Sequence, residues 1–203
     1  MQWRLLRRRG PLRSFTVVGD LAQSAAEPPA TSWAEALGAL TDDFRLERLT
    51  VNYRTPRAVA QLAEARALQD GLPITPSTSV RDGEAPLVVR ADRDRLAAAV
   101  VEAVAADRSR ADGGALAVIA PAARVHDLHD ALVAGTGERV GYGAQGLGAP
   151  VSVLDPWTAK GLEFDSVVVV DPDAIAREAG PGSLYVASTR PTRRLVVVET
   201  AEP

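Results

Sequence analysis

Three short apolar runs without a polar residue constrain the fold more than any other feature of the chain. They are Leu116–Ile119 (LAVI), 167–170 (VVVV) and 195–198 (LVVV). A strand exposed on one face alternates apolar and polar residues, so runs without that alternation predict strands buried on both faces. Stretches with helical spacing of apolar residues separate these runs. Strands that alternate with helices predict an α/β fold, with a mostly parallel sheet and helices on both faces.

Weaker patterns extend this prediction. Further strands are expected at 87–89 and 151–154, and helices at 92–108, 124–133 and 183–190. The glycine-rich stretch 135–148 is expected to be a loop with one short strand. In open parallel sheets ligands collect at the carboxyl ends of the strands, so that edge is the expected place for a ligand.

The first third of the chain is less regular. Gln2–Arg9 has a helix-compatible pattern. Short strands are expected at 15–18 and 44–51, with a small helix between them that Thr31 or Ser32 caps. A longer helix is expected from Pro56 to about Gln69, with Thr55 as its cap, because proline suits the first helical position.

Composition narrows the class of protein. Apolar residues make up 46% of the 203, which is enough for a buried core. The sequence contains no run of about 18 uncharged apolar residues, so no transmembrane helix is expected. The first residues lack the apolar core of a signal peptide. The chain has no cysteine, and its net charge of −3 does not indicate a polyanion binder as a whole. These features together predict a cytoplasmic protein without a membrane partner.

No metal site is predicted. The absence of cysteine excludes thiolate ligands. His126 and His129 lie three residues apart on an expected helix, but no third ligand converges on them in the sequence, and a protein zinc site needs at least three ligands.

One polar stretch carries groups that can bind a nucleotide. Between the apolar runs at 151–154 and 167–170 lie Lys160, which is the only lysine of the chain, Gly161 and Glu163. A lysine and the backbone N–H groups around a glycine can meet phosphate, and Glu163 can accept hydrogen bonds from two ribose hydroxyls. A turn whose charged residues are simply solvated is the alternative interpretation.

A second polar segment follows the expected strand at 15–18. Gly19 allows a close approach of the backbone to a ligand. Asp20 can accept a hydrogen bond from a metal-bound water, and Gln23 can orient a water or contact a terminal phosphate. A strand followed by an ordinary polar turn explains the same residues.

Two further segments offer an aromatic ring and two arginines. In 49–56 the ring of Tyr53 presents a flat face to a base, and Arg54 presents a planar fork to phosphate. The expected helix at 183–190 ends in Arg190, which can reach the phosphate of a partner domain. A helix-capping turn with an arginine in solvent is the alternative for the first of these segments.

In order and spacing, the four segments resemble motifs III to VI of the UvrD-like superfamily 1 helicases. The matching stretches are GDLAQ at 19–23 for motif III, NYRT at 52–55 for motif IV, TAKGLEF at 158–164 for motif V and YVASTR at 185–190 for motif VI. The resemblance implies that residues 50–203 form a RecA-like second motor domain. It also implies that residues 1–49 are the C-terminal fragment of the first motor domain.

The resemblance assigns roles at an ATP site between two motor domains. It implies that Gln23 senses the γ-phosphate, that Tyr53 stacks on adenine and that Arg54 contacts the γ-phosphate. It further implies that Glu163 binds the ribose and that Arg190 is a second arginine on the γ-phosphate. Asp20 and Gly161 complete the expected nucleotide-binding set.

Motif VI departs from the family in one residue. The family has alanine after its arginine, whereas Pro191 follows Arg190 here. Proline disfavours α geometry at the residue before it, so the helix is expected to end at Arg190 and the guanidinium to be re-aimed.

Two family motifs have no counterpart in the sequence. No Gly-x-x-x-x-Gly-Lys-Ser/Thr loop is present, and neither is the acidic motif that holds Mg²⁺. The chain is therefore expected to be the C-terminal part of a longer ATPase that binds ATP and Mg²⁺. By itself it is expected to bind no cofactor and to hydrolyse no ATP.

Two differences from the UvrD-like pattern indicate which group within the family the chain resembles. Only about a hundred residues separate the segments similar to motifs IV and V, too few for the large inserted domain of UvrD-type helicases, and the aromatic residue that follows motif III in DNA translocases is missing. On both points the chain resembles the actinobacterial HelD-type ATPases, which release RNA polymerase from nucleic acid. The alternatives are a DNA-repair helicase and a non-catalytic interaction domain.

The expected partners follow from the same resemblance. They are the first motor domain, RNA polymerase, and DNA or RNA. An unpaired strand at 15–18 is also prone to associate with another chain, so a dimer through the N-terminal segment is a further expectation.

Overall fold

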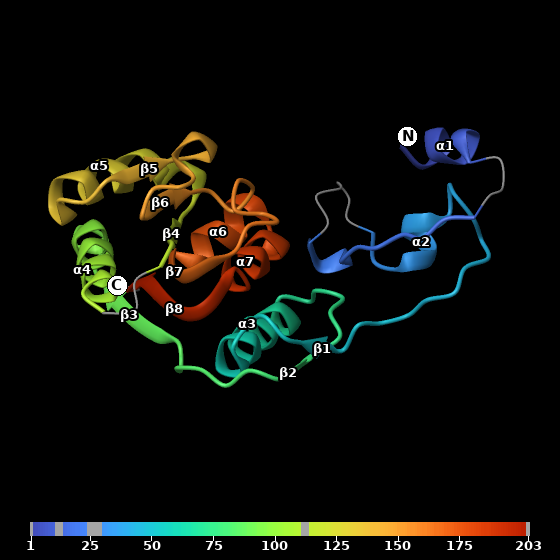
Figure 1. Ribbon diagram of the computed structural model, residues 1–203, viewed down its shortest axis with the longest axis horizontal. Coiled ribbons are helices and arrows are strands. Elements are labelled where there is room, and N and C mark those ends of the chain that lie inside the picture. Colours follow the sequence, from blue (N-terminus) through green and yellow to red (C-terminus); the bar gives the residue numbers. More distant parts are fainter. Residues whose placement is uncertain (1, 11–13, 24–29, 111–113, 202–203) are drawn as a thin grey trace.

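The computed structural model describes residues 2–10, 14–23, 30–110 and 114–201. Its centre is a six-stranded, fully parallel sheet in the order β3-β8-β7-β4-β6-β5 (Figure 1). The strands are β3 (Leu87–Ala91), β4 (Leu116–Ile119), β5 (Val140–Tyr142), β6 (Val151–Leu154), β7 (Phe164–Val170) and β8 (Pro191–Thr200). The expected α/β fold with a parallel sheet is confirmed.

The three apolar runs form the middle of this sheet. They lie in β4, β7 and β8, which are direct neighbours. Every residue of β4 and of 167–170 is buried, as expected for strands covered on both faces.

Helices cover the two faces of the sheet. On one face, α4 (Leu96–Arg108) and α5 (Val125–Thr136) bury their apolar residues against the strands. The other face is covered by α3 (Arg57–Gln69), α6 (Pro172–Ala179) and α7 (Pro181–Ser188). Short 3-10 turns, η2 (Ala122–Arg124) and η3 (Ala144–Gly146), lie in the connections after β4 and β5.

A small lobe carries α3 beside the main sheet (Figure 1). Its two-residue strands β1 (Val51–Asn52) and β2 (Thr78–Ser79) pair in parallel on either side of α3 in the chain. The carboxylate of Glu64 on α3 accepts hydrogen bonds from the backbone N–H of Ser77, at 3.0 Å, and from its hydroxyl, at 2.7 Å. This contact ties the helix to the returning strand.

Among the described residues, the N-terminal part contains three short helical elements. These are α1 (Gln2–Arg9), η1 (Leu21–Gln23) and α2 (Trp33–Leu37). Ser32 caps α2 as expected, because its hydroxyl accepts from the backbone N–H of Glu35 at 3.1 Å. Among the described residues, no strand of this part pairs with the main sheet.

The expected strands at 15–18 and 44–51 are wrong for most of their length. Residues 15–18 are extended but belong to no sheet, and only Val51 of the second run is paired. A strand needs a neighbour that receives its hydrogen bonds, and among the described residues only the end of the second segment, beside Thr78, has one. Composition alone cannot report whether that neighbour exists.

Three features of the helices also differ from expectation. Helix α6 was not predicted from the sequence, and Pro172 occupies its first turn. The helix expected at 183–190 runs from Pro181 to Ser188 instead. Thr55 does not cap α3, because Pro56 occupies the cap position and no side chain bonds there.

The described helices include none that is both long enough and apolar enough to cross a membrane. The proposed boundary near residue 50 between two motor domains stays a prediction.

Candidate functional site

The polar stretch 155–163 crosses the sheet from one edge to the other. Leu154, at the end of β6, is level with Ile119 of β4, and Ile119 is level with Val169 of β7. Phe164, the first residue of β7, therefore lies at the opposite, amino edge. The stretch is not the tight turn that the sequence suggested, and it brings Glu163 to the amino edge.

Hydrogen bonds of its own fix the start of this crossing segment. One carboxylate oxygen of Asp155 accepts from the backbone N–H of Trp157 at 2.8 Å and of Thr158 at 3.0 Å. The other oxygen accepts from the Thr158 hydroxyl at 2.7 Å. Gly161 has a φ of +82°, a left-handed conformation that glycine adopts without strain.

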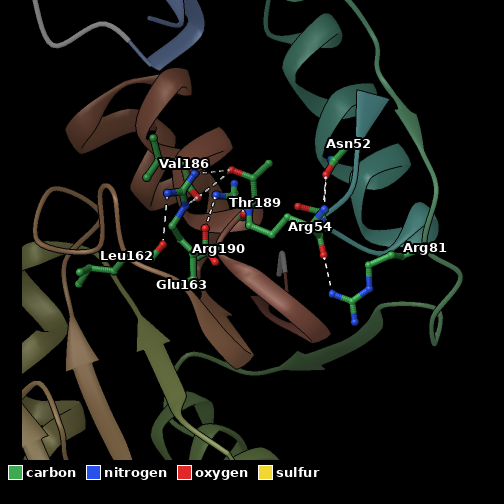
Figure 2. Close-up of polar contacts among 9 residues, drawn as sticks. Asn52, Arg54, Arg81, Leu162, Glu163, Val186, Thr189 and Arg190 are labelled. Carbon is green, nitrogen blue, oxygen red and sulfur yellow. Dashed lines mark hydrogen bonds and ion pairs between the residues drawn. The ribbon is translucent and has the colours of Figure 1, made fainter. Parts of the chain in front are cut away.

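An arginine and a glutamate from distant segments meet at the amino edge. Arg54 Nη1 donates to Glu163 Oε1 at 2.8 Å, across 109 residues of sequence (Figure 2). Arg54 Nη2 also donates to the carbonyl of Thr189 at 3.4 Å. Its Nε is buried and has no hydrogen-bond partner among the described residues. About a third of the Arg54 side chain is exposed, and half of the Glu163 side chain.

The backbone around Arg54 is held by two neighbours. The side-chain oxygen of Asn52 accepts from the backbone N–H of Arg54 at 3.1 Å and of Thr55 at 3.0 Å. Arg81 Nη1 donates to the carbonyl of Arg54 at 3.1 Å (Figure 2). The position of Arg54 is therefore fixed from both sides of its peptide.

Arg190 reaches the same region from the end of α7, but it is enclosed. Its Nε donates to the carbonyl of Val186 at 3.0 Å, Nη1 to the carbonyl of Leu162 at 3.3 Å and Nη2 to the hydroxyl of Thr189 at 3.2 Å (Figure 2). Only 3% of the residue is exposed. Helix α7 ends before Arg190, two residues earlier than expected, and the guanidinium turns back onto the helix.

The surroundings shift two pKa values. Burial lowers the pKa of Arg190, the nearby charge of Arg54 lowers it further, and Glu163 opposes both. Burial raises the pKa of Tyr185 to about 12, with smaller upward contributions from the charges of Asp20 and Glu64. The two arginines thus lie close enough for mutual repulsion, with Glu163 as the compensating charge.

The segment with Asp20 and Gln23 docks beside this cluster. Lys160 Nζ donates to the carbonyl of Gln23. Ala22 is buried against α7, where a Cβ on Gly182 would come within 2.4 Å of the Ala22 carbonyl oxygen. The Gln23 side chain donates to Asp20 at 2.8 Å. Residues 20–23 therefore lie next to α7 and the crossing segment.

The remaining predicted residue, Tyr53, is open to solvent. Its exposed fraction is 78%, and the residue directly precedes Arg54. The structure thus brings together Arg54, Glu163 and Arg190, and it places residues 20–23 and Tyr53 at their margins. These residues lie at the amino edge of β7 and β8 and not at the carboxyl edge, where ligands were expected.

Sequence reasoning missed several residues that shape the cluster. Thr189, Leu162 and Val186 contribute mainly backbone carbonyls, which leave no signature in the sequence. Gly182 could have drawn notice, because a glycine inside a helical run costs stability and often marks a close backbone approach.

His126 and His129 lie on α5 beside Asp130 and Tyr142. His126 and His129 both contact Asp130 and face the ring of Tyr142 edge-on. In the part of the chain that the structure describes, no group of three or more His, Cys, Asp or Glu residues could hold a metal ion.

Comparison with known proteins links this fold to a helicase domain. No family model matches the chain, and no curated protein matches it. Among solved structures, the C-terminal domain of a possible DNA helicase from Lactobacillus plantarum WCFS1 is similar, with 27% sequence identity and a TM-score of 0.58. The match covers 73% of this chain and 88% of that one. The chain therefore has the α/β fold of that helicase C-terminal domain.

Proposed function

We propose that the cluster of Arg54, Glu163 and Arg190 is one half of an ATP site that lies between two motor domains. The contact between Arg54 and Glu163 carries this proposal, because it joins two segments 109 residues apart at an exposed edge of the domain. Structural similarity to a helicase C-terminal domain supports it. The other half of the site would come from a domain with a phosphate-binding loop.

The residues of the cluster fit parts of a nucleotide. Glu163 would accept hydrogen bonds from the ribose hydroxyls, and Arg54 would donate to phosphate. About a third of the Arg54 side chain is exposed, so a phosphate can reach its guanidinium from solvent. Tyr53 is exposed beside Arg54, where its ring could stack on adenine.

The margins of the cluster fit the phosphates. The backbone N–H groups around Gly161 would lie toward phosphate. Gln23 and Asp20 would contact the terminal phosphate and the water around Mg²⁺ once their mutual hydrogen bond opens. The Mg²⁺ ligand and the catalytic carboxylate would belong to the other domain, so the ion would add charge neutralisation at the phosphates.

We further propose that the whole protein is a compact motor of the HelD type, which acts on RNA polymerase. The compactness supports this: between β1 and the crossing segment the chain builds β3, β4, β5 and β6 of one sheet, so no separate domain is inserted there. A DNA-repair helicase and a non-catalytic interaction domain are the competing functions.

An ATP titration followed by NMR tests the half-site. We expect weak binding, with a Kd of about 1 mM or higher, and shifts confined to residues near Tyr53, Arg54 and Glu163. Arg54→Gln should weaken binding about tenfold, because a charged hydrogen bond contributes about 1.5–3 kcal/mol. Arg45→Gln is the matched control, since the Arg45 side chain is 89% exposed and pairs with Glu47, far from the cluster in sequence.

Two outcomes would contradict the half-site. One is ATP hydrolysis by the 203-residue chain alone, which would require a phosphate-binding loop that its sequence lacks. The other is the absence of any shift near Arg54 at saturating ATP, or equal effects of Arg54→Gln and Arg45→Gln.

A second experiment separates the competing functions. Full-length protein would be tested for RNA polymerase binding and for stimulation of its ATPase by single-stranded DNA. Polymerase binding without DNA stimulation supports the HelD-type function. Strong DNA stimulation without polymerase binding favours the repair helicase, and polymerase binding without any ATPase favours an interaction domain.

A further inference from the structure

Arg190 is bonded to both neighbours of Glu163. Its Nη1 donates to the carbonyl of Leu162 at 3.3 Å, and its own carbonyl accepts from the backbone N–H of Phe164 at 3.2 Å. These two hydrogen bonds flank Glu163 in the chain. The peptide that carries the Glu163 side chain is therefore tied at both ends to residue 190.

The rest of the guanidinium is occupied by α7. Nε donates to Val186 and Nη2 to the hydroxyl of Thr189, and the residue is 3% exposed (Figure 2). Because the residue is 3% exposed, a phosphate would reach this guanidinium only after the packing around the Leu162 carbonyl or the end of α7 opens. Either change would free the segment that holds Glu163.

Arg54 differs from Arg190 in both respects. A third of its side chain is exposed, and its Nε has no partner among the described residues. It can exchange Glu163 for a phosphate without disturbing any backbone segment, because its bond to Glu163 joins two side chains.

We infer that Arg190 is a positioning residue that aims Glu163 at the ribose, and that Arg54 is the arginine that contacts phosphate. This assignment rests on the proposed ATP half-site and gives the two arginines different roles in it. It differs from the expectation that both arginines contact the γ-phosphate.

Ligands that lack one part of ATP separate the two roles. ATP compared with 2′,3′-dideoxy-ATP reports the contribution of the ribose hydroxyls. ATP compared with adenosine reports the contribution of the phosphates. For the wild-type chain we expect NMR titrations to give about tenfold weaker binding of the dideoxy compound, as for the loss of hydrogen bonds to a charged group.

The variants then act on different ratios. Arg190→Gln should reduce the ribose preference to about onefold and leave the ratio of ATP to adenosine unchanged. Arg54→Gln should lower the ratio of ATP to adenosine binding and leave the ribose preference unchanged. Arg190→Lys keeps a charge and one donor for the Leu162 carbonyl, so it should restore part of the ribose preference.

Arg194→Gln is the matched control for a purely structural role. Arg194 is also a buried arginine, at 7% exposure, and it lies four residues along in β8, bonded to Asp107. Its loss should lower stability and leave both ligand ratios unchanged. If Arg190→Gln does not fold, Arg190→Lys carries the test.

The outcomes distinguish this inference from the proposed function. If the wild-type chain shows neither a ribose preference nor a phosphate contribution, the ATP half-site itself is wrong. If the wild-type chain shows both, and Arg190→Gln or Arg190→Lys lowers the phosphate ratio while keeping the ribose preference, Arg190 contacts phosphate and the inference is wrong.

Discussion

Three arginines of this chain differ mainly in how far solvent reaches them. The Arg45 side chain is 89% exposed and that of Arg54 32%, whereas Arg190 as a whole residue is 3% exposed. An exposed arginine pair contributes little to stability, because water screens its charge. A partly exposed arginine such as Arg54 can exchange partners, and a buried one is held by the acceptors that compensate its desolvation. Exposure therefore separates their roles where residue type cannot.

The buried pair of Asp107 and Arg194 provides a test at this scale. Asp107 Oδ1 accepts from Arg194 Nε at 2.6 Å and from the Ser166 hydroxyl at 3.0 Å, and both charged side chains are 8% exposed. Asp107→Ala should lower the free energy of unfolding by about 3–5 kcal/mol, because it removes the carboxylate that Arg194 and the Ser166 hydroxyl bind in the core.

Urea denaturation measures this difference. Asp82→Ala is the control, since Asp82 is 86% exposed and lies 3.4 Å from Arg57. Its cost should stay below about 1 kcal/mol. Similar losses of unfolding free energy in the two variants would show that the buried pair stabilises the fold no more than an exposed pair does.

Among the elements, α7 connects several segments around the site. Its first turn contacts the carbonyl of Ala22, and its end supplies the Thr189 carbonyl to Arg54. Arg190, just beyond it, holds the crossing segment through Leu162. A shift of this helix would therefore move residues 20–23, Arg54 and Glu163 together.

Gly182→Ala tests the docking of residues 20–23 on α7. The added Cβ would lie 2.4 Å from the Ala22 carbonyl oxygen, so the two segments must separate. We expect faster amide hydrogen exchange at residues 21–23 and unchanged exchange in β7 and β8. Ser183→Ala, on the same helix turn, is the control and should leave exchange at 21–23 slow. Unchanged protection in Gly182→Ala would mean that this contact does not hold the segment.

The sequence predicted elements well where burial alone decides them. The run 167–170 is apolar because both faces of β7 are covered, and that pattern is visible without a structure. The run 15–18 has similar residues but no neighbouring strand among the described residues, and pairing leaves no local signal. The crossing of 155–163 was missed for a related reason, since only the strand register reveals that its two ends lie at opposite edges.

The candidate site was predictable in its side chains but not in its geometry. Arg54, Glu163 and Arg190 were identified from their residue types and order, and the structure places them together. Their location at the amino edge and the enclosure of Arg190 depend on backbone carbonyls of Leu162 and Val186. Such acceptors exist at every residue, so no sequence pattern selects them.

At the scale of the whole molecule, the main sheet is built without strands from the described N-terminal residues. All six strands of the sheet lie between Leu87 and Thr200, and the residues described before Val51 add none (Figure 1). The N-terminal part also exposes apolar side chains, among them Leu5 at 55% and Val18 at 86%. These features suit a segment that completes another domain or pairs with a second copy of the chain.

Removal of residues 1–49 tests this division. A chain of residues 50–203 should keep the NMR fingerprint of the six strands, because the core on both faces of the sheet is built from residues after 58. It should also be monomeric in sedimentation at concentrations where the 203-residue chain associates. Loss of the sheet signals would show that the first 49 residues belong to the same folding unit.

The central claim is that a nucleotide binds at the amino edge of β7 and β8. Photolabelling with 8-azido-ATP, followed by mass spectrometry of the peptides, locates the adenine directly. A nucleotide at the amino edge should label the peptide that contains Tyr53, and the label should be removed by excess ATP and reduced in Arg54→Gln. A label that ATP removes from peptides of the carboxyl edge, such as those with Tyr142 or Asp171, would contradict it.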